Sequence, residues 1–366
     1  MILYFFIFFL LLSGALLEII SNNKKFSQST FTFFIFCFFI LSFIRWETGT
    51  DWTPYYDVFK SIEIPWETLT DYLHGFEPGF MILYNIAKSI SDSYTIMLLT
   101  EAIILYFCIY YFIKAHSFYP ILSLLIYYSM SFAGIFFVRQ NIAMAILLCS
   151  LKYIYEKKII PFILIVIIAA SIHRTAIIFL IAYPFFYKFY KLKSIILVTL
   201  LASIIGITLG KLMLTFLGEL GLGIISAKVN AYLDAGTDDN ATTFSTTGVL
   251  IRGLINRAFL IIVYLSILNN ERKNNVILNG LINLNILGII LYVILTPIAF
   301  SLGRITAYFD ILQIFIIPYL FINSSLKTKC NLLFLLSLYL GLRLYTAIAA
   351  FPEEYIPYKT FLEYYS

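Results

Sequence analysis

The stretch Ile159–Tyr187, IIPFILIVIIAASIHRTAIIFLIAYPFFY, decides the fold class of this chain. It is largely apolar, with Ser171, His173 and Arg174 at its middle, and lysines flank both of its ends. A helix of roughly 20 apolar residues crosses a bilayer, so this stretch is longer than one span needs. A single helix would also place one lysine flank outside the cell, whereas lysines collect in cytoplasmic loops. We therefore predict two short half-helices that form a hairpin: the first runs outward from the cytoplasmic side, the second returns to it, and His173 and Arg174 lie at the tip. The alternative is one long tilted span.

The whole chain has the same apolar character. Of its 366 residues 61% are hydrophobic and 12% are charged, against roughly a quarter charged in soluble domains. The mean hydropathy is +0.92. A soluble globule is thereby excluded, and we predict an all-α polytopic integral membrane bundle of about 10 to 12 spans, re-entrant half-helices included. No internal boundary is apparent, so a single membrane domain is expected over residues 1–366.

The positive-inside rule orients these spans, because lysine-rich loops belong in the cytoplasm. Two long polar segments, 45–94 and 210–247, then fall outside, and the short apolar piece Phe80–Ile90 within the first is expected to be re-entrant or interfacial. The remaining spans are expected at Met1–Ile20, Thr30–Ile44, Tyr94–Ile113, Ser117–Phe132, Ile135–Tyr155, Ser194–Leu209, Gly248–Leu268, Val276–Leu295, Ile305–Ile322 and Leu332–Ala350.

Several function classes lose their support at this point. The net charge of +5 is what cytoplasmic loops of a membrane protein carry, so nucleic acid is not an expected partner. The four cysteines have no C-x-x-C spacing, which argues against a disulfide framework and a zinc site. Walker, dinucleotide, zincin and nucleophile-elbow motifs are all missing from the sequence. We expect no cofactor and no metal.

Ionisable side chains in the outer half of the spans are the main functional signal, because charge at membrane depth is costly. These residues are Arg45, Glu101, Arg139, Arg174, Arg252, Arg257, Arg304 and Arg343. Guanidinium groups bind phosphate oxygens bidentately, so the set predicts an outward-facing phosphate or pyrophosphate site. Snorkelling or structural ion pairs are the alternative. The residues assigned to pyrophosphate binding are Arg45, Arg139, Arg174, Arg252, Arg304 and Tyr308, the last of which shares a helix face with Arg304.

Three residues are candidates for catalysis. His173 lies in an apolar stretch beside Arg174, and a neutral imidazole is a suitable general base near pH 7. Asp51 follows a span in a tight turn, where a carboxylate would orient or deprotonate a sugar hydroxyl. Glu77 precedes Pro78 and is placed to cap a helix N-terminus. For each residue an ordinary structural role is the competing interpretation.

Five motifs in a fixed order resemble the EpsG-type group of Wzy polysaccharide polymerases. They are Arg45-x-x-x-Gly49-x-Asp51-x-x-x-Tyr55-x-x-x-Phe59, Glu77-Pro78-Gly79-Phe80, Val138-Arg139-Gln140-x-Ile142-Ala143, His173-x-Thr175-Ala176, and Gly303-Arg304 with Tyr308-Phe309. The resemblance spans the chain from Arg45 to Phe309, and Thr175 stands where the family often has serine.

The resemblance implies a GT-C-like glycosyltransferase in the bacterial inner membrane, multi-pass, with its active site facing the periplasm. Such an enzyme polymerises O-antigen or capsule repeat units: the growing glycan moves from undecaprenyl pyrophosphate onto the next lipid-linked oligosaccharide. Its implied partners are that lipid-linked oligosaccharide, the bilayer and a chain-length regulator protein, and it needs no nucleotide sugar.

Two other functions are alternatives to polymerisation. An O-antigen ligase would transfer finished polymer to lipid A core. A lipid-linked oligosaccharide flippase would be a transporter with a cavity open alternately to both faces, which the one-sided placement of the buried charges disfavours.

Overall fold

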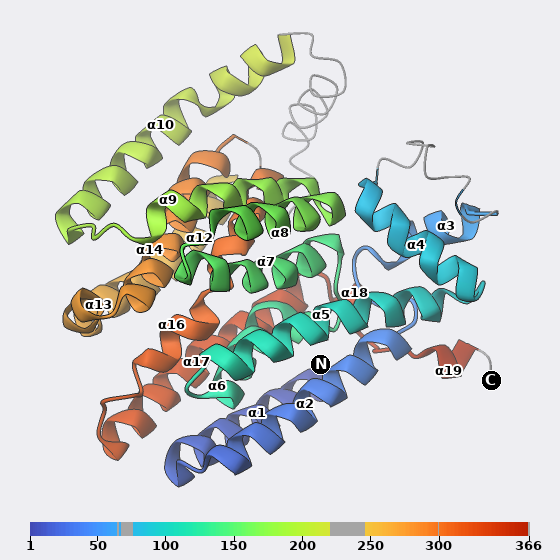
Figure 1. Cartoon of the computed structure of the whole chain (residues 1–366), viewed down its shortest axis with the longest axis horizontal. Coiled ribbons are helices and arrows are strands. Elements are labelled where there is room, and N and C mark those ends of the chain that lie inside the picture. Colours follow the sequence, from blue (N-terminus) through green and yellow to red (C-terminus); the bar gives the residue numbers. More distant parts are fainter. Residues whose placement is uncertain (64–65, 67–75, 220–245, 299, 365–366) are drawn as a thin grey trace. The chain divides into compact units, whose positions relative to one another are not determined.

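The structure is a computed structural model that describes residues 1–63, 66, 76–219, 246–298 and 300–364. Within those ranges the regular secondary structure is helical and contains no strand (Figure 1). The all-α class expected from the sequence is therefore confirmed. The chain forms two compact units, residues 1–180 with 313–366 and residues 181–312. Apolar spans run through both units, which explains why the sequence displays no boundary, and one membrane domain over 1–366 stays a prediction.

Most of the helices that the structure describes belong to the first unit. They are α1 Ile2–Ser21, α2 Lys24–Ile44, α3 Trp52–Ser61, α4 Pro78–Ile90, α5 Tyr94–His116, α6 Pro120–Ser131, η3 Phe132–Gly134, α7 Arg139–Tyr155, α8 Ile159–Ile172, η4 Arg174–Ile181, α16 Gln313–Tyr319, α17 Leu326–Ala350, α18 Pro352–Tyr355 and α19 Phe361–Tyr364. The helix η4 ends one residue into the second unit. The second unit holds α9 Ala182–Phe186, α10 Leu192–Glu219, α12 Thr246–Ile267, α13 Asn269–Asn274, α14 Val276–Leu295, η5 Phe300–Thr306 and α15 Ala307–Asp310.

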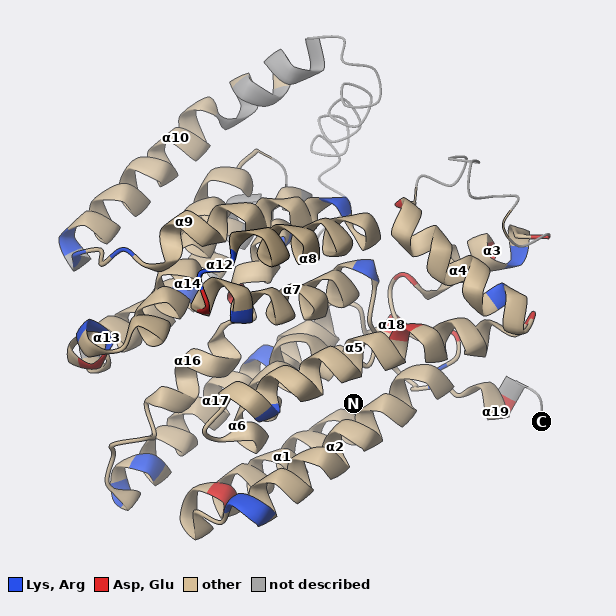
Figure 2. Cartoon of the chain, viewed as in Figure 1, with Lys and Arg blue, Asp and Glu red and all other residues tan. Residues whose placement is uncertain are grey.

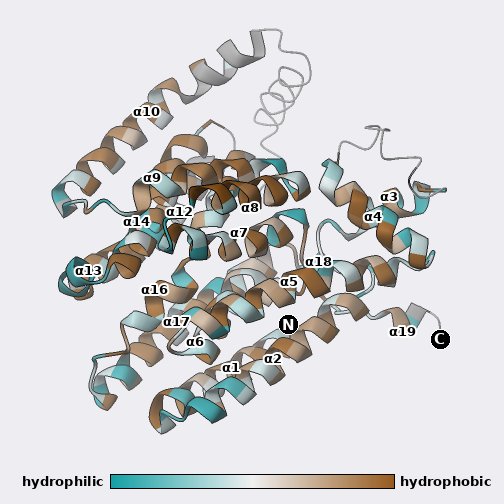
Figure 3. Cartoon of the chain, in the orientation of Figure 1, coloured by the Kyte–Doolittle hydropathy of each residue, from teal (hydrophilic) through white to brown (hydrophobic). Residues whose placement is uncertain are grey.

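Among the described residues, five helices are long and apolar enough to cross a membrane: α1, α2, α5, α14 and α17. Five shorter apolar segments add to them, at Pro120–Gly134, Ile159–Ile172, Arg174–Phe186, Lys193–Leu209 and Gly253–Leu265. Figure 3 shows hydrophobic residues along nearly the whole of α8, and Figure 2 shows basic residues at helix ends such as the starts of α2 and α10. Together these features define a polytopic membrane protein.

The hairpin predicted between Ile159 and Tyr187 is present. The helix α8 ends at Ile172, and His173 has extended backbone angles, φ −147° and ψ 108°. The Phe162 and Phe179 rings lie 6.4 Å apart. In one continuous helix residues so far apart in sequence would be separated by roughly 25 Å, so the chain folds back at His173 and the single tilted span is wrong.

Other expected boundaries need correction. Ile305–Ile322 is not one helix but three pieces, η5, α15 and α16, and Asp310 within it is 6% exposed and engaged by Thr306. A buried carboxylate needs such partners, and supplying them interrupts the helix. The helix α10 continues past Leu209 into the segment expected as the external loop 210–247; residues 220–245 of that loop lie outside the described part of the chain.

A buried carboxylate fixes the first helices to α6. Glu18 of α1 is 3% exposed and accepts hydrogen bonds from the backbone N–H groups of Ile121 and Leu122, at 3.2 and 3.0 Å. Ser27 of α2 donates to the same carboxylate. The free N–H groups at a helix N-terminus are thereby satisfied by a side chain from another helix.

The C-terminal segment covers the turn that follows α2. The backbone N–H groups of Trp46 and Gly49 donate to the carbonyls of Lys359 and Glu354, at 3.0 and 2.8 Å. Gly49 has φ +106°, and a Cβ there would lie 3.1 Å from the Arg45 guanidinium. Both facts require glycine at this position of the first motif.

Candidate active site

Glu77 stands at the centre of the candidate site. It is the N-cap residue of α4, immediately before Pro78 at the first helical position. Its side chain is buried, with the residue 6% exposed. Gly79 permits this arrangement, because a Cβ there would clash with Ser171 of α8 at 2.2 Å. The start of α4 can therefore approach the end of α8 closely.

Three other predicted site residues surround the Glu77 carboxylate. Arg139 Nη1 forms an ion pair with Glu77 Oε2. The backbone N–H of Arg174 donates to Oε1 at 3.1 Å, and Arg174 Nε lies 3.8 Å from the same oxygen. His173 Nδ1 is 3.7 Å from Oε1, an electrostatic contact slightly longer than a hydrogen bond. Residues from three separate motifs of the sequence thus meet at one carboxylate.

The charge state of Glu77 follows from these neighbours. Burial raises the pKa of its carboxyl group, but interactions with His173, the Arg174 backbone N–H and the Arg139 guanidinium outweigh burial and lower the pKa from 4.5 to about 2. Glu77 is therefore an anion at neutral pH. A carboxylate of such low basicity is a poor general base and a good electrostatic partner for cations.

Arg139, the first residue of α7, is held on several sides. Its Nε donates to the Tyr55 hydroxyl at 3.3 Å, and its guanidinium carbon lies 4.2 Å from the Phe76 ring centroid and 5.6 Å from that of Phe80. Cation–π contacts and the ion pair with Glu77 together fix the plane of the guanidinium. The sequence identified Tyr55 only as a member of a motif, and it gave no signal for Phe76.

His173 and Arg174 lie at the tip of the hairpin, as expected. The His173 side chain is 24% exposed and that of Arg174 is 60% exposed. His173 Nδ1 is buried and has no hydrogen-bond partner. The tip therefore presents an accessible guanidinium next to an imidazole whose buried nitrogen faces a carboxylate.

Arg45 has a different environment from Arg139 and Arg174. It is 3% exposed, and its guanidinium donates to the carbonyls of Thr48 and Phe137 at 3.4 and 3.0 Å. The Phe137 ring lies 4.6 Å from its guanidinium carbon. These contacts join the end of α2 to the segment before α7, which favours a structural role; the pyrophosphate role assigned to Arg45 stays a prediction.

Asp51 lies one helical turn before Tyr55, at the start of α3, and its backbone carbonyl accepts from the Tyr55 N–H at 3.4 Å. The residue is partly buried. It makes no hydrogen bond or ion pair with the Glu77 carboxylate or the groups bound to it in the described structure. Its role as a base or orienting group also stays a prediction.

The remaining predicted residues belong to the second unit. Arg304 is exposed and Tyr308 is 1% exposed, while the Arg252 side chain lies outside the described residues. Their assignment to pyrophosphate binding stays a prediction.

Arg257, another of the arginines expected near the outer face, is committed to an ion pair. Its Nη2 and Nε lie 2.5 and 3.2 Å from the two Asp310 carboxylate oxygens, and Nη2 also donates to Thr306 at 2.9 Å. The Tyr292 ring centroid lies 3.9 Å from its guanidinium carbon. The ion pair provides hydrogen-bond donors for the buried Asp310 carboxylate. Because the Arg257 guanidinium is engaged in this way, a structural role is favoured for Arg257. The sequence prediction does not include Asp310, although an acid inside an apolar run is itself a signal.

Among the described residues, no three or more His, Cys, Asp or Glu side chains lie close enough together to form a metal-binding site.

The fold and this cluster define a class: an all-α, multi-pass membrane protein with a carboxylate, an imidazole and two guanidinium groups gathered at one place. The EpsG family model matches residues 28–360, and the chain belongs to the EpsG family. The family indicates a polysaccharide polymerase-like membrane protein with glycosyltransferase-type chemistry. Neither the curated proteins nor the solved structures contain a match.

Proposed function

We propose that this protein is an O-antigen or surface polysaccharide polymerase that transfers a growing glycan from undecaprenyl pyrophosphate onto an incoming lipid-linked repeat unit. The observation that carries the proposal is the meeting of Arg139, His173 and Arg174 around the Glu77 carboxylate. The reaction needs a cation for the departing pyrophosphate and a base for the attacking hydroxyl. The cluster contains both kinds of group.

Arg174 is the residue best placed to bind the pyrophosphate. Its side chain is 60% exposed, whereas that of Arg139 is 18% exposed and already paired with Glu77. Guanidinium binds two phosphate oxygens at once and keeps its charge at any physiological pH. Negative charge builds on the pyrophosphate as the glycosidic bond breaks, and Arg174 stabilises it there. Arg139 adds positive charge nearby and holds Glu77.

His173 is the proposed general base. With a proton on Nδ1, facing Glu77, its Nε2 is free to accept a second proton. The acceptor hydroxyl gives its proton to Nε2 while its oxygen bonds to the anomeric carbon. The bond from that carbon to the pyrophosphate oxygen breaks, and undecaprenyl pyrophosphate leaves with the electron pair. Glu77 stabilises the imidazolium that results; Asp51 is the second candidate for the base.

The site is proposed to open to the periplasm of a bacterial inner membrane. Two lysines precede α8 and three follow the stretch that ends at Tyr187, and the positive-inside rule places such lysines in the cytoplasm. The tip of the hairpin, with His173 and Arg174, then faces the opposite side. This is the side on which lipid-linked repeat units await polymerisation.

The test is reconstitution of the purified full chain in lipid nanodiscs with a synthetic undecaprenyl-pyrophosphate-linked repeat unit. Polymerisation produces a ladder of chain lengths on a gel without any nucleotide or partner protein. Arg174→Ala is expected to abolish the ladder, and Lys327→Ala, which removes an exposed cation from α17, is the control. An unaltered ladder from Arg174→Ala would remove this residue from the site.

The same experiments separate the alternatives. A flippase would produce no glycan product in nanodiscs, where both leaflets are accessible, and cells without it would accumulate repeat units in the cytoplasmic leaflet. If the protein were a ligase, its deletion would leave long polymer unattached to lipid A core, whereas deletion of a polymerase leaves single repeat units.

A chain-length regulator protein is a proposed partner. It would narrow the range of polymer lengths in the ladder but would not be needed for polymer to form.

A further inference from the structure

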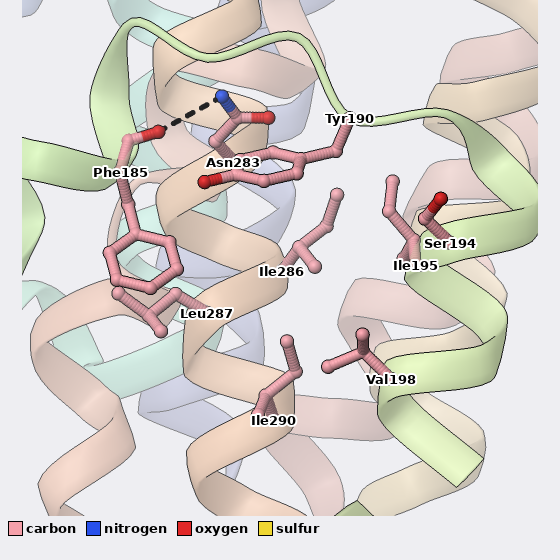
Figure 4. A pocket seen from close by; sticks show the side chains of 9 residues that line it. All are labelled: Phe185, Tyr190, Ser194, Ile195, Val198, Asn283, Ile286, Leu287 and Ile290. Atoms are coloured by element: carbon pink, nitrogen blue, oxygen red, sulfur yellow. Dashed lines mark hydrogen bonds between the residues drawn. The ribbon is translucent and has the colours of Figure 1, made fainter. Parts of the chain in front are cut away.

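A cavity of about 130 Å³ lies within the second unit, between α10, α14 and the loop that joins α9 to α10 (Figure 4). Its deeper walls are aliphatic and include Val198 of α10 and Ile286, Leu287 and Ile290 of α14. An apolar cavity of roughly this size, ~150 Å³, is large enough for benzene and stays empty of water. The space therefore suits a short length of hydrocarbon chain.

Tyr190, Ser194 and Asn283 bound the end of the cavity beside the loop, although the surface that lines the space is mainly apolar there too (Figure 4). The Asn283 amide donates to the carbonyls of Phe185 and Lys188, at 3.2 and 2.5 Å, which fixes the loop over α14. The cavity itself is thus apolar and suits an acyl chain, and the polar groups that a phospholipid headgroup needs belong to the adjoining loop.

The loop beside the cavity and the first turn of α10 are basic. Lys188, Lys191 and Lys193 are exposed and alternate with residues that bound the cavity, and none of the three has an ion pair among the described carboxylates. Arg272 of α13 anchors the same loop by donating to the Tyr190 carbonyl at 2.9 Å. Three unpaired ammonium groups beside an apolar cavity are complementary to a phosphate that carries an acyl chain.

The helix α10 leaves this cavity accessible from the side. Only one face of α10 packs against α14, through Ile195 and Ala202, which are 6% and 5% exposed. Its neighbours Leu197 and Val198 are 58% and 46% exposed. A lipid in the bilayer can therefore enter the space beside α10 without opening a packed interface.

We propose that this cavity is a binding site for an anionic phospholipid, with one acyl chain between α10 and α14 and the phosphate on Lys188, Lys191 and Lys193. The lysine loop belongs to the cytoplasmic side in the topology given above, so the lipid comes from the inner leaflet. It is separate from the polyprenyl donor proposed for the Glu77 cluster, and the site stands whether or not that proposal holds.

The test is native mass spectrometry of the full chain purified in detergent, titrated with phosphatidylglycerol or with phosphatidylcholine of identical acyl chains. We expect one molecule of phosphatidylglycerol to bind at a much lower lipid concentration than one molecule of phosphatidylcholine. The double variant Lys191→Ala with Lys193→Ala should weaken phosphatidylglycerol binding by roughly 10- to 30-fold. Its control is Lys24→Ala with Lys25→Ala, two exposed lysines at the start of α2.

A second pair of variants tests the cavity itself. Val198→Trp fills it from the side of α10, and Leu197→Trp puts the same bulk on a neighbouring position that does not line it. Only Val198→Trp should reduce phosphatidylglycerol binding. Equal binding of the two phospholipids, or variants indistinguishable from their controls, overturns the proposal. Displacement of phosphatidylglycerol by undecaprenyl phosphate also overturns it, because the cavity would then belong to the donor lipid.

Discussion

His173 Nδ1 lies 3.7 Å from Oε1 of Glu77, and the backbone N–H of the residue that follows it donates to that same oxygen at 3.1 Å. One carboxylate oxygen therefore holds both the imidazole and the turn that carries it. A change at Glu77 acts on charge and on backbone position together. Substitutions that separate these two effects are the most informative ones.

Glu77→Gln keeps the shape of the side chain and removes its charge. Arg139 then loses its counter-ion and His173 loses the group that would stabilise its imidazolium, so polymer formation should fall by roughly 100-fold or more. The measurement is the initial rate of ladder formation in nanodiscs. Glu63→Gln, at an exposed acid after α3, is the matched control. A rate within twofold of the parent chain would exclude Glu77 from the mechanism.

The low pKa of Glu77 predicts how the hairpin tip responds to acid. Because the pKa is lowered from 4.5 to about 2 in the folded chain, the carboxylate stabilises the fold above pH 4.5, and this contribution is lost as the pH falls from 4.5 through 2. Thermal unfolding of the parent chain between pH 5 and 3 should therefore decline more steeply than that of Glu77→Gln. Parallel profiles for the two chains would contradict the assignment.

Tyr55 is expected to position Arg139. Tyr55→Phe keeps the ring and deletes the hydroxyl that accepts from Arg139 Nε at 3.3 Å. One such hydrogen bond contributes about 1 kcal/mol, so the rate should drop by roughly fivefold while the protein inserts normally. Arg139→Lys removes the planar group as well as this bond, and its loss should be larger. If Tyr55→Phe affected Arg139→Lys as strongly as it affects the parent, the two residues would be acting independently.

His173→Gln tests the proposed base. Glutamine is close in size to histidine but has no basic ring nitrogen, so the initial rate of ladder formation should fall by roughly 100-fold or more. The matched control is His116→Gln, at the end of α5. A rate within twofold of the parent chain would transfer the role of base to Asp51, which Asp51→Asn then tests.

Asp310→Asn is expected to destabilise the second unit without touching the Glu77 cluster. The change leaves Arg257 with a neutral partner in a site where the Arg257 and Asp310 side chains are 17% and 8% exposed. Breaking a buried pair from one side costs about 3 kcal/mol or more. The measurement is the thermal midpoint of the purified chain, with Lys273→Ala, at an exposed lysine of α13 in the same unit, as the control. An unchanged midpoint would mean that the pair contributes little.

The sequence predicts much of this architecture because lipid imposes simple rules. The long apolar helices and the reversal at His173 follow from span length and from the position of lysines. Breaks inside apolar runs were harder to foresee: the interruption near Asp310 depends on a partner, Arg257, that lies far away in sequence. A hydropathy profile contains no information about a contact between residues so far apart in sequence.

The sequence predicts Arg139, Arg174, His173 and Glu77 as separate candidates, and their roles stay predictions. It does not predict that Glu77 contacts the other three. Arg45 also belongs to a motif, but its guanidinium does not contact the Glu77 carboxylate in the described structure. It donates hydrogen bonds to the backbone carbonyls of Thr48 and Phe137 instead. Residue type alone does not distinguish these two uses of a guanidinium.

The cover that Glu354 and Lys359 place over the turn at Trp46 and Gly49 has a consequence for biosynthesis. The turn leaves the ribosome about 300 residues before the segment that covers it, so the nascent protein must hold an unfinished turn while the helices between them insert.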